Sequence, residues 1–249
     1  MKYFLILAGL MLMLTAEAQK KVVVENGDTL NRFDDNEKKQ GYWVEHYGAA
    51  RVTGRYKHGV KEGMWLSYFI TGMLNSAVEY RNGMQDGVAL VFDDKGRLRN
   101  ERHMKQNMLH GLNVFYGDNG IPIVKRYYKN NKLDGPLTRY YHNGDTLYLE
   151  YYKNGEKDSI SLFFNEQRVV VARIHYKNGK FDGEYTTYFN DGVLETLTNY
   201  SGGKKQGDYL EYYESGKLKV KGSYNNDLKT GKWIYYDETG KKVKTEKFP

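Results

Sequence analysis

Histidine, cysteine and clustered carboxylates are the side chains that most often carry acid–base, nucleophilic or metal chemistry. The chain has no cysteine, and its histidines are scattered, at positions 46, 58, 103, 110, 142 and 175. It contains no HExxH, CxxC, P-loop, GxSxG or paired-carboxylate pattern. The sequence therefore predicts no enzymatic activity, no metal site and no cofactor.

Two sets of acidic residues could suggest a metal site. The run Asp34, Asp35, Asn36, Glu37 resembles the start of a calcium loop, but it lacks the glycine at the sixth position and the bidentate glutamate at the twelfth. Asp134, Asp158 and Asp182 recur every 24 residues, each directly before a turn position. We interpret the first set as a solvated linker and the second as turn residues.

The element behind this recurrence is an internal repeat of 24 residues. Stepping from Gly183 in units of 24 gives Gly63, Gly87, Gly111, Gly135, Ser159, Gly207 and Gly231, without insertion or deletion. Numbering each unit from this residue as position 1, residues 41–249 form nine units, of which the first is two residues short and the last is incomplete. His103 and His175 share position 17, but lie three units apart, roughly 30 Å, and cannot form one site.

Each unit has the pattern of a β-hairpin followed by a second turn. Position 10 is glycine in seven units, often after Asn, Asp or Ser, and a second turn such as Asn82-Gly83 or Asn178-Gly179 follows about twelve residues later. Aromatic residues fill position 6, chiefly Tyr68, Tyr116, Tyr140, Tyr188 and Tyr212, and also position 18. The intervening segments are rich in Tyr, Phe, Thr, Val and Leu, which favour strands.

The geometry of the first loop decides which residues share a face. A two-residue turn at positions 9 and 10 would pair position 6 with position 13, whereas a three-residue loop with a bulge would pair it with position 12. Position 12 is mostly apolar and position 13 is mixed. We therefore expect the bulged loop, and with it positions 6, 12 and 18 on one face.

A single hairpin is marginally stable in water, so neighbouring units are expected to pair side by side. The predicted fold is all-β: an elongated single-layer array of tandem antiparallel β-hairpins, forming a twisted ribbon. At roughly 10 Å per unit, nine units would extend about 85 to 90 Å. Lys241, Lys242, Lys244 and Lys247 are expected to protect the last strand from edge pairing.

The N-terminus differs from the repeats. Lys2, an apolar run from Tyr3 to Leu14 and the segment Ala16-Glu17-Ala18 have the layout of a signal peptide over residues 1–18. About twelve apolar residues are too few to span a bilayer. We expect export through a cleaved signal peptide, to the periplasm, the cell surface or the medium, and a capping segment at residues 19–40.

Composition narrows the class of partner. The 24 tyrosines, 27 glycines and mean hydropathy of −0.76 suit a thin layer better than a thick core. The net charge is +7, but the 38 basic residues are dispersed among 31 acidic ones. A nucleic-acid reader usually concentrates its basic residues, so no nucleic-acid partner is expected.

The unit Tyr-x-x-Gly-x-x-x-Gly-x-aromatic-x-x-Tyr resembles the bacterial variant of the MORN repeat over residues 41–249. The resemblance is carried by segments such as YRNGMQDG at 80–87, YKNGKFDG at 176–183 and GDYLEYYESG at 207–216. It implies an elongated hairpin array for protein contact, in some members for attachment to membrane surfaces, and an antitoxin of the YwqK type by family label. Units 3 to 6 depart most from the pattern, at Ala89, Met104, Pro122, Ser159 and Arg168.

Two functions follow as hypotheses. The first is a non-enzymatic scaffold that docks another protein at the cell envelope or outside the cell. The second is binding of carbohydrate or an anionic lipid surface through rows of Tyr and Lys, with Tyr141, Tyr151, Tyr213 and Tyr235 as candidate surface residues because their positions differ from 6 and 18.

Overall fold

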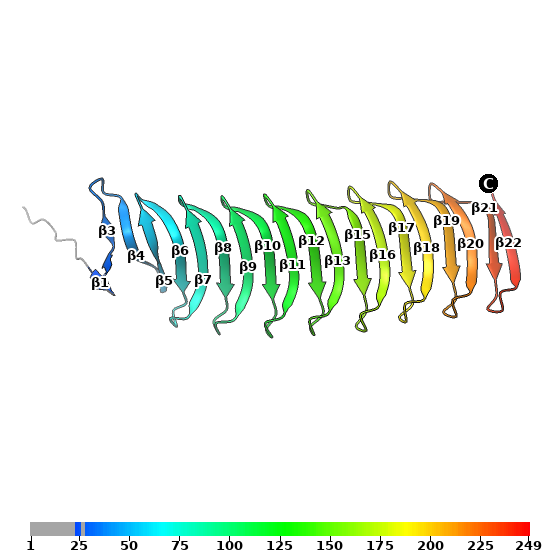
Figure 1. The fold of residues 1–249 in the computed structure, drawn as a ribbon, viewed down its shortest axis with the longest axis horizontal. Helices are drawn as coiled ribbons and strands as arrows, with labels where there is room; N and C mark the ends of the chain where they lie inside the picture. Colours follow the sequence, from blue (N-terminus) through cyan, green and yellow to red (C-terminus); the bar gives the residue numbers. More distant parts are fainter. Residues whose placement is uncertain (1–22, 26–27) are drawn as a thin grey trace, which may run out of the picture.

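The computed structural model describes residues 23–25 and 28–249. The predicted signal peptide, residues 1–18, lies outside the described residues. The described part is all-β, with no helix and therefore none that could cross a membrane. The prediction of an elongated single-layer hairpin array is confirmed (Figure 1).

The strands are short and follow one another with the period of the repeat. In chain order they are β1 (Val23–Glu25), β2 (Asp28–Leu30), β3 (Arg32–Phe33), β4 (Lys39–Tyr47), β5 (Ala50–Lys57), β6 (Val60–Tyr68), β7 (Leu74–Arg81), β8 (Met84–Phe92), β9 (Leu98–Lys105), β10 (Met108–Tyr116) and β11 (Pro122–Lys129). They continue with β12 (Lys132–Tyr140), β13 (Thr146–Lys153), β14 (Glu156–Lys157), β15 (Ser159–Phe164), β16 (Val170–Lys177), β17 (Lys180–Tyr188), β18 (Leu194–Ser201), β19 (Lys204–Tyr212), β20 (Leu218–Asn225), β21 (Leu228–Tyr236) and β22 (Lys242–Phe248).

From β3 to β22 the strands form one antiparallel sheet in which each long strand pairs with its neighbours in sequence. Among the described residues no pairing joins β22 to β3, and the two lie at opposite ends of the array (Figure 1), so the sheet is open. In this view the strands stay nearly upright along the whole length. The connections therefore form two long edges, one on each side of the ribbon.

The bulged loop expected at position 10 is present. Tyr68 pairs with Leu74, that is, position 6 with position 12, and Ser67 pairs with Ser76. The amide of Gly72 donates to the carbonyl of Phe69 at 2.8 Å, and Gly72 has a φ of 84°. The same pairing recurs in every unit with a five-residue connection. We call the row of these connections, residues 69–73, 93–97, 117–121, 141–145, 165–169, 189–193, 213–217 and 237–241, the loop edge.

The second turn is a two-residue turn with positive φ at both positions, as at Asn82 (51°) and Gly83 (79°). Its row, which we call the turn edge, comprises residues 57–60, 81–84, 105–108, 129–132, 153–156, 177–180, 201–204 and 225–228. Asp134 and Asp182 accept hydrogen bonds from the amides of Asn154 (3.1 Å) and Gly202 (3.0 Å) in the next turn. The interpretation of Asp134 and Asp182 as turn residues is wrong, because they lie inside β12 and β17 and their carboxylates instead accept from the amides of the neighbouring turn.

The prediction that positions 6, 12 and 18 share a face is wrong for position 18. Tyr80, at position 18, pairs with Gly63, and Trp65, at position 3, pairs with Val78. Because side chains alternate along a strand, position 18 shares a face with position 3, and position 6 lies on the other face. The bulge at position 13 adds one residue between positions 12 and 18, which reverses the expected alternation.

The position 3 face, made of positions 1, 3, 5, 14, 16 and 18, holds most of the buried side chains. Trp43, Trp65 and Trp233 are buried at position 3. Their rings meet the rings of position 18, or of the equivalent Tyr56 in the short first unit, edge to face. The ring centres lie 4.9 Å apart for Tyr56 and Trp65, and 5.1 Å apart for Tyr224 and Trp233. Because a single layer has no second sheet to cover it, these side-by-side aromatic contacts replace a central core.

The first edge of the array is covered by residues 29–38. Leu30 is buried, and the Phe33 ring lies 5.1 Å from that of Trp43. Asp34, from the acidic run, accepts hydrogen bonds from the amides of Asn36 and Lys38 at 3.0 and 2.9 Å. The carboxylate thus closes the hairpin loop between β3 and β4.

One deviation from the repeat leads to a stability prediction. Ser159 replaces the position 1 glycine and keeps its positive φ, 75°. Because a non-glycine residue is strained there, Ser159→Gly should raise the free energy of unfolding by about 1 kcal/mol. The reverse change, Gly207→Ser, should lower it by a similar amount, since a Cβ at Gly207 meets nothing closer than 3.8 Å. Denaturant unfolding of both variants measures this, and equal effects of one sign would contradict it.

Candidate interaction surfaces

Two of the four candidate tyrosines link adjacent units. Tyr141 and Tyr213 occupy position 7, at the start of the loop edge. Their hydroxyls donate to the backbone carbonyls of Phe164 and Tyr236 in the next unit, each at 2.8 Å. These two side chains therefore hold adjacent units together.

The other two lie on opposite faces. The Tyr235 hydroxyl donates to Glu246 Oε2 at 2.7 Å, and this hydrogen bond raises the pKa of Tyr235 to about 12. Tyr151 is 37% exposed and lies on the position 6 face. The structure therefore does not bring the four tyrosines together, and Tyr151 is the one with an exposed ring.

The rows of lysine and aromatic side chains also contact each other. Lys61 Nζ lies 4.0 Å from the ring centre of Trp65 and 5.2 Å from that of Tyr80. Lys229 Nζ lies 4.1 Å from Trp233. The same arrangement recurs at Lys39, two residues before the first unit, and at Lys157 and Lys205, which occupy position 23. Such cation–π contacts stabilise the sheet and occupy the ring faces that a sugar would otherwise stack upon.

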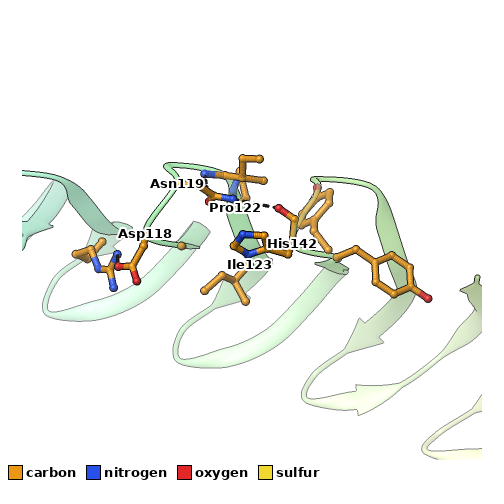
Figure 2. Close-up of a pocket in the computed structure, with 10 residues that line it drawn as sticks. Asp118, Asn119, Pro122, Ile123 and His142 are labelled. Atoms are coloured by element: carbon orange, nitrogen blue, oxygen red, sulfur yellow. Dashed lines mark hydrogen bonds and ion pairs between the residues drawn. The ribbon is translucent and has the colours of Figure 1, made fainter. Parts of the chain in front are cut away.

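A depression on the loop edge lies at the divergent units. It has a volume of about 370 Å³ and spans the loops after β10 and β12; its lining is Arg99, Gly117, Asp118, Asn119, Ile121, Pro122, Ile123, Tyr140, Tyr141 and His142. Figure 2 shows Asp118 on one side, and Ile123 and His142 on the other. We call it the loop-edge depression.

Hydrogen bonds hold the walls of the loop-edge depression in place. The side-chain amide of Asn119 donates to the His142 carbonyl at 3.1 Å, drawn as a dashed line in Figure 2. The Ile121 amide donates to Asn119 Oδ1 at 3.0 Å. With the Tyr141 hydroxyl also fixed, both loops are tied to each other and to the next unit. The depression is therefore preformed.

A charged network borders one side of it. Arg99 donates to Asp118 Oδ1 at 2.6 Å, and Arg97 lies 3.3 Å from the same oxygen and 2.8 Å from Asp93 Oδ2. The hydrogen bond from Arg99 lowers the pKa of Asp118, which keeps this carboxylate ionised at neutral pH. Asp118 is exposed. Apolar side chains on one side and a charged rim on the other are typical of a contact site for another protein.

The side chains that reach this edge come from the bulge. Ile123 and Arg99 occupy position 13, the extra residue that pairs with nothing across the sheet. A bulge re-aims the side chain that it inserts, which explains why position 13 has no repeat constraint; its members are Asn75, Arg99, Ile123, Leu147, Val171, Glu195, Lys219 and Val243. Ile123 is 43% exposed. Sequence reasoning missed these residues, although the mixed composition of position 13 was the signal for them.

The histidines serve local structure. His103 Nε2 lies 3.2 Å from Glu101 Oε1, and His175 Nδ1 lies 2.9 Å from the Glu184 carbonyl. Within residues 23–25 and 28–249, no group of three or more His, Cys, Asp or Glu side chains could hold a metal ion.

An open, single-layer array of similar hairpins with exposed faces and edges defines a class of β-repeat proteins. Three segments of the chain, residues 133–154, 181–201 and 205–226, match the family described as MORN repeat variant. These three matches support the resemblance of the repeats to the MORN variant. MORN repeats are, in general, modules that contact proteins or membranes. A comparison with curated proteins found no match.

Proposed function

We propose that the protein is an exported, non-enzymatic scaffold that binds another protein through the loop-edge depression. The observation that carries this proposal is the preformed hollow at the divergent units, where Ile121 and Ile123 lie beside the Arg99–Asp118 pair. A preformed site loses little conformational entropy on binding. The rest of the array serves to hold this surface and its neighbours at fixed spacing.

Several features support a scaffold over a closed binding domain. Each unit adds two strands and roughly 10 Å of length, so separate contacts along the ribbon can combine into one stronger attachment. The N-terminal segment has the composition of a signal peptide. On this basis the partner lies in the envelope or outside the cell.

Site-specific photo-crosslinking in envelope extracts tests the proposal. A crosslinker placed at Ile123 should capture one protein, whereas the same group at Ile70, a loop-edge isoleucine that is 78% exposed, should not. Ile123→Asp should weaken binding of the purified partner at least about tenfold, because it puts a charge into an apolar contact, and Ile70→Asp should leave it unchanged. No specific product at Ile123, or equal effects of both substitutions, would overturn the proposal.

A further inference from the structure

The two edges of the ribbon carry opposite charge. The turn edge contains nine basic residues, Lys57, Arg81, Lys105, Lys129, Lys132, Lys153, Lys177, Lys180 and Lys204, and two acidic ones, Glu156 and Asp227, for a net charge of +7. The loop edge contains nine acidic and five basic residues, for a net charge of −4. The basic residues that are dispersed in the sequence are thus concentrated by the fold.

The basic residues of the turn edge form a regular line. Position 19, or position 17 in the short first unit, is Lys or Arg in six consecutive units, from Lys57 to Lys177, and all six residues are exposed. Because each unit advances the sheet by roughly 10 Å, the line extends about 50 Å. In Figure 1 the turns that carry it lie in one row along the top of the ribbon.

These cations have few partners of their own. Within the described part of the chain, Arg81 forms an ion pair with Asp86 at 3.6 Å, but no ion pair engages Lys105, Lys129, Lys153 or Lys177. The nearby acids Asp134 and Asp182 accept hydrogen bonds from turn amides. The line of lysines is therefore available to an external anion.

We propose that the turn edge binds a linear anionic polysaccharide. A straight line of cations one residue wide fits a chain that carries repeated negative charges. Between Lys105 and Lys180 the turn residues are Lys, Asn, Gln, Gly and Glu, with Met108 half-buried. The centre of this edge therefore has no exposed apolar side chain, which suits a hydrated polymer as the partner. Exposed apolar residues of the turn edge, Val60, Met84 and Leu228, lie only toward its ends, which favours a polymer over a lipid surface.

Two variants of equal charge separate this site from general electrostatic attraction. The turn variant replaces Lys105, Lys129, Lys153 and Lys177 by Gln. The matched control replaces Lys95, Lys217, Lys241 and Lys242 by Gln, four exposed lysines outside the turn edge. Both have the same net charge, and circular dichroism verifies that both remain folded.

Binding is measured by calorimetry with polygalacturonate fragments of increasing length, at several salt concentrations. Affinity for the wild-type protein should rise with length until a fragment spans the line. In the turn variant it should fall at least about tenfold, with a salt slope less steep by about 3 for four lost contacts, while the control should stay within about twofold of wild type. Equal losses in both variants, no length dependence, or no binding to polygalacturonate would overturn the proposal.

Anionic phospholipid vesicles and duplex DNA serve as competing ligands. If either of these ligands binds through the same lysines more tightly than polygalacturonate does, then that class of ligand, and not a polysaccharide, is the partner of the turn edge. This test is independent of the protein partner proposed for the loop-edge depression, because the depression and the lysines lie on opposite edges of the ribbon. Ile123→Asp should therefore leave polysaccharide binding unchanged.

Discussion

Trp65→Ala should destabilise the N-terminal units by about 3 to 5 kcal/mol, the cost of removing a large buried aromatic side chain. Trp65 is 3% exposed, its ring meets those of Tyr56 and Tyr80, and its indole Nε1 donates to the Arg55 carbonyl at 3.1 Å. In a linear array each unit contacts only its neighbours. The loss should therefore stay local.

Amide hydrogen exchange resolves where the loss occurs. Exchange should become faster in β5 to β8 and stay unchanged in β19 to β21. Met64→Ala, a change at the adjacent exposed residue on the opposite face, should have little effect. A uniform change along the whole chain would show that the units unfold together, and no change at all would show that the aromatic contacts do not hold the sheet.

Gly222→Ala should cost about 1 to 3 kcal/mol through overpacking. Gly222 lies beneath the Trp233 ring, and a Cβ there would lie 2.2 Å from Trp233 Cδ2. The backbone φ at Gly222 is not in the left-handed region, so the cost comes from this contact and not from backbone strain. Trp233 is 2% exposed and has little room to move.

A double-mutant cycle isolates that contact. In a Trp233→Ala background, Gly222→Ala should cost close to nothing, because the ring that it strikes is gone. The free energies of unfolding of the four proteins are measured by denaturant titration with a probe in β21. Their differences give the coupling energy between the two substitutions. Additive effects of the two substitutions would contradict the close approach of ring and backbone.

The repeat period and the turn chemistry were sufficient to predict the architecture. Glycine at position 10 and the apolar residues at position 12 predicted the bulged loop, and Asn-Gly pairs predicted the second turn, because both depend on local backbone conformation. The faces were harder to predict. The bulge residue at position 13 shifts the alternation by one, so Tyr80 joins Trp65 and not Tyr68, and this depends on hydrogen-bond pairing between strands.

The candidate surfaces were only partly predictable. Tyr141 and Tyr213 have positions that differ from the packing positions, yet their hydroxyls bridge units, which a sequence does not display. Conversely, Ile123 gave no signal as a single residue, and the turn-edge lysines seemed dispersed along the chain. Both become surfaces only when the fold places residues 24 apart side by side.

We infer that the 24-residue units of this open array are interchangeable. Deletion of residues 183–206 joins Asp182 to Gly207 and removes one whole unit, whereas deletion of residues 183–194 removes half a unit and breaks the register. Small-angle X-ray scattering should show that the full-unit deletion stays folded and is shorter by about 10 Å in its longest dimension, while the half-unit deletion does not. Collapse of the full-unit deletion, or an unchanged length, would contradict the account.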